Sequence, residues 1–572
     1  MNMNALTNNA IQILKNRYLL KDEKGRLIES PNEMFIRVAK HISSCEKKNT
    51  FYQQQFYNLL NSLKFLPNSP TLMNAGNKKG QLSACFVLPI EDSMDSIFTT
   101  LKNAALIHQS GGGTGFNFSK LRPKEDLVSS NSGTSSGPVA FIKIYDAATE
   151  YVKQGGKRRG ANMGVLNIDH PDIEIFIKSK SSKKAIENFN ISVGIPDAFM
   201  IALKNNQNWQ LINPRTKKVS KTISAQSLWE LIINEAWNTG DPGIIFLDTI
   251  NKNNPIPTIG HIEATNPCGE VPLLSYESCN LGSINLSKMV AVKNGNYILD
   301  WNCLSETIHL AIRFLDNVIT TNYYLLPKIE AITKSNRKIG LGVMGWAELL
   351  ILLEIPYASK EALSLAETLM SFIKNESYKA SENLAKEKDP FPNWRKSTLT
   401  KTPLRNATCN SIAPTGTISV IANTTYSIEP LFALAYKRVG ILDNQTQIEI
   451  NESFIQKMKK LKLWNNELEK EVLEKGSIKN INTIPEKVKS IFQTSLEIPW
   501  QYHLKHQKIF QQYTDNAVSK TINLPEQATV DDISKIYKTA WEYELKGITI
   551  YRYGAKNYQV LQKCNLNTSK YC

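Results

Sequence analysis

The sequence is poor in the residues that cross-link small proteins or bind structural zinc. It has eight cysteines and seven histidines in 572 residues, and no Cys-x-x-Cys pair occurs. A disulfide scaffold needs a higher density of cysteine, and a zinc site needs closely spaced ligands. We therefore expect no metal site built from side chains. Cys45, Cys303 and Cys409 are expected to fill core space, and the other thiols are candidates for redox or radical chemistry.

Long apolar runs are also missing. No stretch of eighteen or more apolar residues occurs, so no membrane span is expected. Residues 1–7 lack the basic region and apolar stretch of a signal peptide, which predicts a cytoplasmic protein. A hydrophobic content of 42% is enough for a sizeable core and excludes a disordered chain.

The charge is unbalanced, with a formal net charge of +16. This excess could indicate polyanion binding. However, lysine-rich segments such as 178–184 and 457–462 have no interleaved aromatic residues for base stacking. We interpret the excess as lysine spread over solvated faces, with phosphate-bearing small molecules as the alternative and no nucleic-acid partner.

Several glycine-rich segments are present, but none ends in the Gly-Lys-Ser/Thr of a P-loop. Segments 111–117, 132–138 and 154–162 are either flexible loops or loops whose amides approach an anion. Segment 413–419 precedes an expected helix start, which favours phosphate binding. Segment 340–345 has a formal Gly-x-Gly-x-x-Gly pattern without a preceding apolar strand, so we expect it to serve close helix packing.

Apolar periodicity predicts helices over residues 1–62, with one helix starting at Ser30-Pro31. A second helix is expected to run from the Asp92–Ser96 cap to about Gln109. Short apolar runs alternate with helical patterns over residues 165–300, which indicates an α/β architecture. Residues 303–387 are rich in helical patterns, and residues 547–552 resemble a strand.

The segment Asn266-Pro267-Cys268-Gly269-Glu270 carries the most suggestive chemistry. In an extended loop, residues i, i+2 and i+4 point the same way, so an amide, a thiol and a carboxylate would share one face. Pro267 would stiffen this loop, and Gly269 would let a substrate come close. A second cysteine, Cys279, follows.

Seven motifs together resemble the catalytic subunit of ribonucleotide reductase from Tyr18 to Arg552. They are Asn-Ser-Pro-Thr-Leu at 68–72, Ser-Ala-Cys at 83–85, Glu-Asp-Ser-Met-Asp-Ser at 91–96, Gly-Gly-Lys-Arg-Arg-Gly at 155–160, Asn-Pro-Cys-Gly-Glu at 266–270, Ser-Cys-Asn-Leu-Gly-Ser at 278–283 and Pro-Thr-Gly-Thr-Ile at 414–418. The eleven-residue spacing of Cys268 and Cys279 resembles the adenosylcobalamin-dependent class II enzymes.

The resemblance implies a ten-stranded α/β barrel of two parallel half-barrels, with a central finger loop that carries the radical cysteine. The implied domains are an N-terminal helical region at 1–62, without an ATP-binding cone, the barrel at 63–553 and a flexible tail at 554–572. It also implies that cobalt–carbon homolysis in adenosylcobalamin places a thiyl radical on Cys268. Glu270 would act as general base, Asn266 would hold the sugar, and Cys85 and Cys279 would close to a disulfide.

The same resemblance implies two nucleotide sites. The ribonucleoside di- or triphosphate substrate would contact Ser69, Ala84, Cys85, Gly113, Asn266, Pro267, Cys268, Gly269, Glu270, Pro414, Thr415, Gly416, Thr417 and Ile418. A deoxynucleoside triphosphate effector would contact Asp92, Ser93, Met94, Arg122, Lys157 and Arg158. In the family the effector site lies at a homodimer interface.

A cysteine pair on the C-terminal tail would pass electrons from a thioredoxin- or glutaredoxin-type reductant, although Cys564 and Cys572 are unusually far apart for this role. Three other interpretations stay open. One is a class I-type large subunit that needs a separate radical-generating subunit, although residues 549–552 contain one tyrosine where class I relays have two adjacent tyrosines. The others are a catalytically silent nucleotide-binding regulator and a basic nucleic-acid-binding protein.

Overall fold

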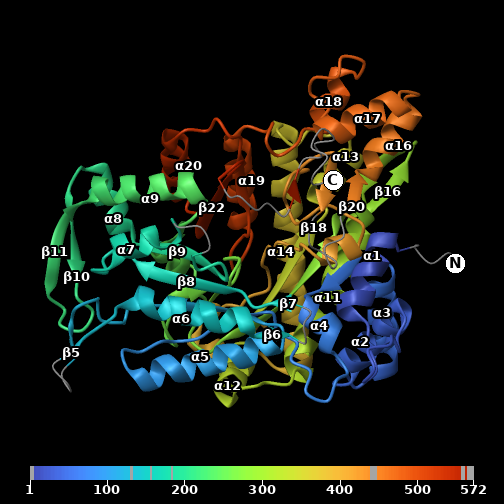
Figure 1. Ribbon diagram of the computed structural model, residues 1–572. Helices are drawn as coiled ribbons and strands as arrows, with labels where there is room; N and C mark the ends of the chain where they lie inside the picture. The colour runs from blue at the N-terminus through green and yellow to red at the C-terminus, as the bar shows by residue number, and fades with distance from the viewer. Residues whose placement is uncertain are drawn as a thin grey trace.

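The computed structural model describes residues 6–128, 133–154, 158–181, 185–438, 447–555 and 561–562. Lys157, Cys564 and Cys572 lie outside this part of the chain. Figure 1 shows N-terminal helices at one end of the molecule and a mixed sheet with surrounding helices beside them. In the described residues, no helix is both long and apolar enough to cross a membrane.

The N-terminal region is helical, as the periodicity predicts. Its elements are α1 (Asn8–Ile13), η1 (Leu14–Tyr18), α2 (Pro31–Ser43) and α3 (Asn49–Asn61). Helix α2 begins where expected, because the Ser30 hydroxyl accepts from the Glu33 amide and the Glu33 carboxylate accepts from the Ser30 amide. Helices α2 and α3 pack on α11 (Trp301–Thr321), where Phe56 meets Phe314 edge to face with ring centroids 5.1 Å apart.

Five parallel strands form one half of a barrel. They are β2 (Cys85–Val87), β3 (Gly113–Asn117), β8 (Asn162–Asn167), β9 (Phe189–Ile195) and β12 (Gly243–Phe246), which neighbour one another in this order. Helices α5 (Met94–Gln109), α6 (Pro138–Tyr151) and α9 (Ala225–Thr239) lie between them in the chain. Strands buried on both faces by such crossovers read as short apolar runs, which is why the sequence predicted an α/β fold.

The second half is also parallel. It contains β15 (Ser278–Asn285), β18 (Ile339–Met344), β21 (Thr521–Leu524) and β22 (Gly547–Arg552). Residues 408–412 lie between β18 and β21, through parallel bridges from Asn410 to Leu341 and from Ile412 to Val518. The halves meet in two antiparallel seams, β2 with β15 and β12 with β22. The predicted barrel of two parallel half-barrels is confirmed, and β1 (Phe65–Pro67) is an antiparallel addition on β15.

The glycines at 340–345 have a different role from the one expected. They lie within and just after strand β18. A Cβ on Gly340 would lie 2.4 Å from Leu281 Cδ2, and one on Gly342 would lie 2.2 Å from the Ser411 carbonyl oxygen. The expectation of close helix packing was therefore wrong, because these glycines let neighbouring barrel strands approach.

Two further expectations need correction or qualification. Cys45 is exposed and Cys303 is partly buried, so only Cys409 fills the core as expected. Within the expected tail at 554–572, the short strand β23 (Leu561–Gln562) pairs with β19 (Ala435–Arg438). Residues 452–512 contain four helices, α16 (Glu452–Lys460), α17 (Asn466–Lys475), α18 (Glu486–Ile491) and α19 (Trp500–Gln512), and α19 packs against the barrel helix α14 (Lys360–Lys388).

Candidate active site

A finger loop stands inside the barrel. Strands β13 (Ala264–Thr265) and β14 (Pro272–Leu273) pair antiparallel, and residues 266–271 form the tip between them. The Val271 amide donates to Asn266 Oδ1 at 3.0 Å, and the Gly269 amide donates to the Asn266 carbonyl at 3.1 Å. Gly269 has φ +80°, which only glycine adopts readily. The tip is thus a closed turn, and the expected extended loop was wrong.

The turn nevertheless presents the predicted groups to one space. Asn266 and Glu270 are each 3% exposed, whereas Cys268 at the apex is exposed. All three line the same cavity. A closed turn therefore gives a buried amide and a buried carboxylate beside an accessible thiol.

The finger is held from both half-barrels. A Cβ on Gly115 would lie 1.7 Å from the Thr265 carbonyl oxygen, and one on Gly113 would lie 2.8 Å from Pro267 Cγ. The Asn190 amide donates to the Pro267 carbonyl at 2.8 Å, while the Ala517 N–H donates to the Glu270 carbonyl at 2.8 Å. The glycines of segment 111–117 are therefore needed where the finger crosses β3. Sequence reasoning found the glycine run but missed this steric reason.

Cys85 and Cys279 occupy the seam between the halves. They are directly opposite each other where β2 pairs with β15, and they are 2% and 1% exposed. The Asn266 amide Nδ2 lies 3.2 Å from Cys85 Sγ, which ties the finger to this pair. Burial raises the pKa of the Cys279 thiol far above its ordinary value. Cys279 therefore stays protonated near neutral pH, although the ammonium of nearby Lys338 acts in the opposite direction.

A cavity of about 310 Å³ lies in front of these groups. Its walls include thirteen of the fourteen residues predicted to bind substrate. These are Ser69, Ala84, Cys85, Gly113, Asn266, Pro267, Cys268, Glu270, Pro414, Thr415, Gly416, Thr417 and Ile418. The remaining one, Gly269, lies on the other side of the finger. The 413–419 segment leads into α15 (Ile418–Ile421), so the expected helix start is present, although the helix is one turn long.

A second cavity of about 570 Å³ lies on that other side and shares Pro267, Cys268 and Pro414 with the first. Its walls bring in charged side chains that sequence reasoning missed: Asp241, Glu429, Lys520 and Lys546. Burial lowers the pKa of Lys546 to about 7. These residues come from separate loops and strand ends without a shared motif, so no local sequence signal pointed to them.

The residues predicted to bind an effector are only partly described. Arg122 Nε lies 2.8 Å from Asp92 Oδ2, and the Ser93 hydroxyl caps α5 by accepting from the Ser96 amide. Met94 is 61% exposed beside them. Arg158 begins the short strand β7 (Arg158–Arg159), where only the backbone is described. The structure thus brings together Asp92 and Arg122, with Ser93 and Met94 adjacent.

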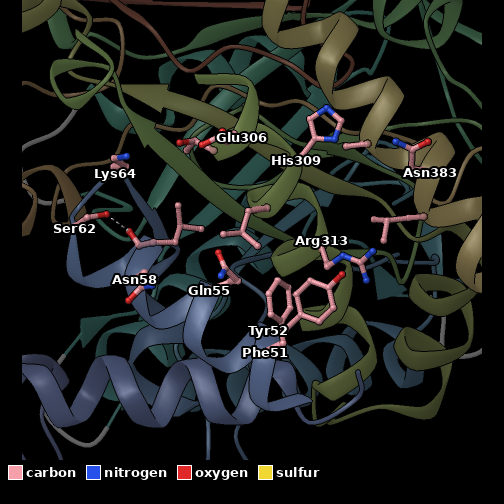
Figure 2. A pocket seen from close by; sticks show the side chains of 15 residues that line it. Phe51, Tyr52, Gln55, Asn58, Ser62, Lys64, Glu306, His309, Arg313 and Asn383 are labelled. Carbon is pink, nitrogen blue, oxygen red and sulfur yellow. Dashed lines mark hydrogen bonds between the residues drawn. The ribbon is translucent and has the colours of Figure 1, made fainter. Parts of the chain in front are cut away.

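A third cavity, of about 610 Å³, is lined by residues from segments 51–64, 306–313 and 380–384, outside the motifs described above. Figure 2 shows it among α3, α11 and α14, with Phe51, Tyr52, His309 and Arg313 around it. The Arg313 guanidinium lies 4.5 Å from the Tyr52 ring centroid and also pairs with Glu46. Its walls contain none of the predicted site residues. The cavities at Cys268 therefore remain the candidate active site.

Comparisons with known proteins match nearly the whole chain. Residues 83–403 and 398–551 match the family described as "Ribonucleotide reductase, barrel domain", and residues 4–80 match "Ribonucleotide reductase, all-alpha domain". A "Vitamin B12-dependent ribonucleoside-diphosphate reductase" of Thermoplasma acidophilum is 49% identical over 99% of this chain and 81% of its own length. A protein of the same description from Mycobacterium tuberculosis is 47% identical over 96% of this chain and 80% of its own.

More distant relatives share less of the sequence. A "Ribonucleoside-diphosphate reductase subunit alpha" of Chlamydia muridarum is 30% identical over 94% of this chain and 58% of its own length. Among solved structures, the Actinobacillus ureae class Id ribonucleotide reductase alpha subunit has a similar fold. The TM-score is 0.79 at 23% identity, covering 96% of this chain and 97% of that one.

Proposed function

The chain belongs to the ribonucleotide reductase family, and we propose that it is an adenosylcobalamin-dependent enzyme that reduces ribonucleoside diphosphates to 2′-deoxyribonucleoside diphosphates. The relatives that are 47–49% identical are described as vitamin B12-dependent ribonucleoside-diphosphate reductases, whereas the relatives that are 30% identical include both vitamin B12-dependent enzymes and enzymes described as subunit alpha. This difference favours the cobalamin enzyme over an enzyme that needs a second, radical-generating subunit.

One observation carries the catalytic assignment. Cys268, Glu270, Asn266 and Cys85 line a single cavity, and Cys279 lies directly opposite Cys85. An accessible thiol, a buried carboxylate and a buried thiol pair are the groups that a radical reduction of a sugar needs. The complete set also argues against a regulator that has lost catalysis.

The first part of the reaction uses the finger. When bound, adenosylcobalamin supplies the one-electron chemistry that removes the hydrogen atom from the Cys268 thiol. The Cys268 sulfur then takes the 3′-hydrogen atom of the ribose, while Glu270 accepts the 3′-hydroxyl proton as general base. The turn that fixes Asn266 against Cys85 and Val271 holds both groups in place before the substrate arrives.

The second part of the reaction uses Cys85 and Cys279, at the seam between β2 and β15. The 2′-hydroxyl leaves as water with a proton from the Cys85–Cys279 pair. The two thiols supply two electrons in all and close to a disulfide as the C2′–H bond forms. Cys268 returns its hydrogen atom to C3′ and Glu270 returns its proton to the 3′-oxygen. One ribonucleotide and two thiols therefore give one deoxyribonucleotide, one water and one disulfide. Because burial keeps Cys279 protonated, this residue enters the step as a thiol.

The residues on the far side of the finger fit a cofactor. The second cavity reaches Cys268 from the side opposite the substrate cavity and has a volume of about 570 Å³, within the range of small-molecule sites. It combines apolar strand residues with a few buried charged groups. We place the part of adenosylcobalamin that acts on Cys268 in this cavity.

Further parts of the assignment follow the same family pattern. We propose that Asp92, Ser93, Met94 and Arg122, together with Lys157 and Arg158, bind a deoxynucleoside triphosphate at a homodimer interface. Arg122 and Asp92 already form an ion pair there. We also propose re-reduction by a thioredoxin- or glutaredoxin-type protein through Cys564 and Cys572, in the cytoplasm where nucleotides and reductants are supplied.

The decisive experiment is a reduction assay with adenosylcobalamin, a dithiol and each ribonucleoside di- or triphosphate in turn. We expect deoxynucleotide formation without any second subunit, and none above background with Cys268→Ser. Cys303→Ser is the matched control, because this thiol lies on α11 outside both cavities. Unchanged turnover in Cys268→Ser would contradict the mechanism.

A further inference from the structure

A carboxylate is held in the wall of the second cavity by a buried lysine. Glu429 comes from the loop after α15, and its side chain keeps 21% exposure, whereas that of Lys520 is fully buried. Lys520 Nζ donates to Glu429 Oε2, and the Thr521 amide donates to Glu429 Oε1 at 2.8 Å. The two ends of the carboxylate are therefore fixed from β21 and the residue before it.

Each N–H group of the Lys520 ammonium has an acceptor. The ammonium group also lies 3.2 Å from His503 Nδ1 and 3.3 Å from the Thr521 carbonyl oxygen. His503 Nε2 lies 3.0 Å from the Ser495 carbonyl, which places the ring proton on Nε2 and leaves Nδ1 as the acceptor. Burial lowers the pKa of His503 well below its ordinary value, so the ring is neutral. Three acceptors thus match the three N–H groups of Lys520.

Glu429 keeps acceptor capacity at the wall of the cavity, where its side chain is partly exposed. Each carboxylate oxygen has two lone-pair directions, and one on each is used by Lys520 and Thr521. An ion pair built only for stability is a poor choice at this place, because apolar residues of similar volume often stabilise a protein as well or better. A rigid, partly accessible carboxylate is instead suited to bind two neighbouring hydroxyl groups, as acidic residues do at the ribose of bound dinucleotides.

We propose that Glu429 binds the vicinal ribose hydroxyls of the cofactor's adenosyl group, with Lys520 and His503 as positioning residues. This inference rests on the proposed function and names a specific contact within it. Tyr426, Phe432 and Tyr551 line the same cavity and offer planar faces for the adenine base. The site would therefore distinguish cobalamins by the group that reaches Cys268.

The test compares two cobalamins that share the corrin ring. Adenosylcobalamin carries the adenosyl group with its two vicinal ribose hydroxyls on the cobalt, and methylcobalamin carries a methyl group there. Dissociation constants for both are measured by calorimetry on the full chain. We expect Glu429→Gln to weaken adenosylcobalamin about 10- to 100-fold, the range for hydrogen bonds to a charged group, and to leave methylcobalamin unchanged within about twofold.

Two further variants keep the result interpretable. Glu429→Asp retains the charge but withdraws it by one methylene, so we expect a smaller loss that is again confined to adenosylcobalamin. Glu544→Gln makes the same chemical change in an exposed ion pair with Lys252 and should change neither constant. Thermal unfolding without cobalamin identifies any variant that fails to fold. If Glu429→Gln fails to fold, the comparison of the two cobalamins is made with Glu429→Asp.

The outcomes separate this inference from the proposed function. Equal weakening of both cobalamins, or no weakening of either, overturns the role of Glu429 while the cofactor assignment stands. A wild-type protein that binds neither cobalamin overturns both. A loss confined to adenosylcobalamin supports both.

Discussion

The two cavities that meet at Cys268 differ in the groups they offer. The smaller one is lined by thiols, an amide, hydroxyl-bearing side chains and the buried Glu270 carboxylate. The larger one brings in two buried lysines and two acidic side chains from the opposite side. One sulfur atom therefore faces a space with one acidic or basic side chain on one side and a space with four such side chains on the other. The finger separates the two spaces, so a change on one side should leave binding on the other intact.

The largest expected effect tests the thiol pair on the smaller side. A single turnover without reductant should leave a disulfide between Cys85 and Cys279, because these residues are opposed in the sheet. Mass spectrometry of the quenched enzyme measures it. Cys85→Ser and Cys279→Ser should each abolish repeated turnover and still bind cobalamin. A disulfide between other cysteines would contradict the assignment.

The next effect tests the carboxylate on the same side. We expect Glu270→Gln to lower kcat by about 10²- to 10⁴-fold, the usual contribution of a general base, with little change in KM. The cobalamin dissociation constant should stay the same, since Glu270 does not line the larger cavity. A parallel loss of cobalamin affinity would show that the finger does not insulate the two sides.

The finger that separates the two cavities can be displaced by a substitution. A Cβ at Gly115 would lie 1.7 Å from the Thr265 carbonyl oxygen, so Gly115→Ala must move the finger or β3. A displacement of about 1 Å can lower activity by about 10²-fold, and here both cavities should lose affinity together. Gly133→Ala is the matched control, because a Cβ there meets no atom within 4 Å. Wild-type kinetics for Gly115→Ala would show that the close approach is unnecessary.

The last effect concerns stability and the charge of the larger cavity, and it leaves the reacting groups untouched. Burial lowers the pKa of Lys546 from 10.5 to about 7 in the folded protein. Between these values the unfolded chain binds more protons, so the free energy of unfolding should rise with pH in this window. From pH 7 to 9.5 the rise should be about 3 kcal/mol, and Lys546→Met should lack it. Urea unfolding at both pH values measures this, with the exposed Lys252→Met as control.

Much of the smaller cavity could be predicted because its residues lie in short motifs. Cys85, the 266–270 segment and the 414–418 segment each carry their chemistry within five residues or fewer, and the barrel brings them together. The larger cavity could not be predicted in the same way. Glu429, Lys520 and Lys546 are single residues in unremarkable local sequence, and their pairing depends on the tertiary structure.

The failures in the fold have a common physical cause. The turn at Asn266 closes through hydrogen bonds of its own side chain and backbone, which periodicity does not reveal. The glycines at 340 and 342 are determined by atoms of Leu281 and Ser411, which are remote in sequence. By contrast, the starts of α2 and α5 were predictable, because a helix cap is a local interaction.

The position of Cys85 and Cys279 at the seam also has a mechanical consequence. A disulfide there would join β2 to β15 covalently and enclose the rest of the first half-barrel in one chain loop. Each catalytic cycle would form and then break a covalent link between the two halves of the barrel. Such a link lowers the conformational entropy of the unfolded chain. Local unfolding at the seam between β2 and β15 should therefore cost more free energy in the oxidised protein than in the reduced protein. The oxidised enzyme should then be more rigid at this seam than the reduced enzyme.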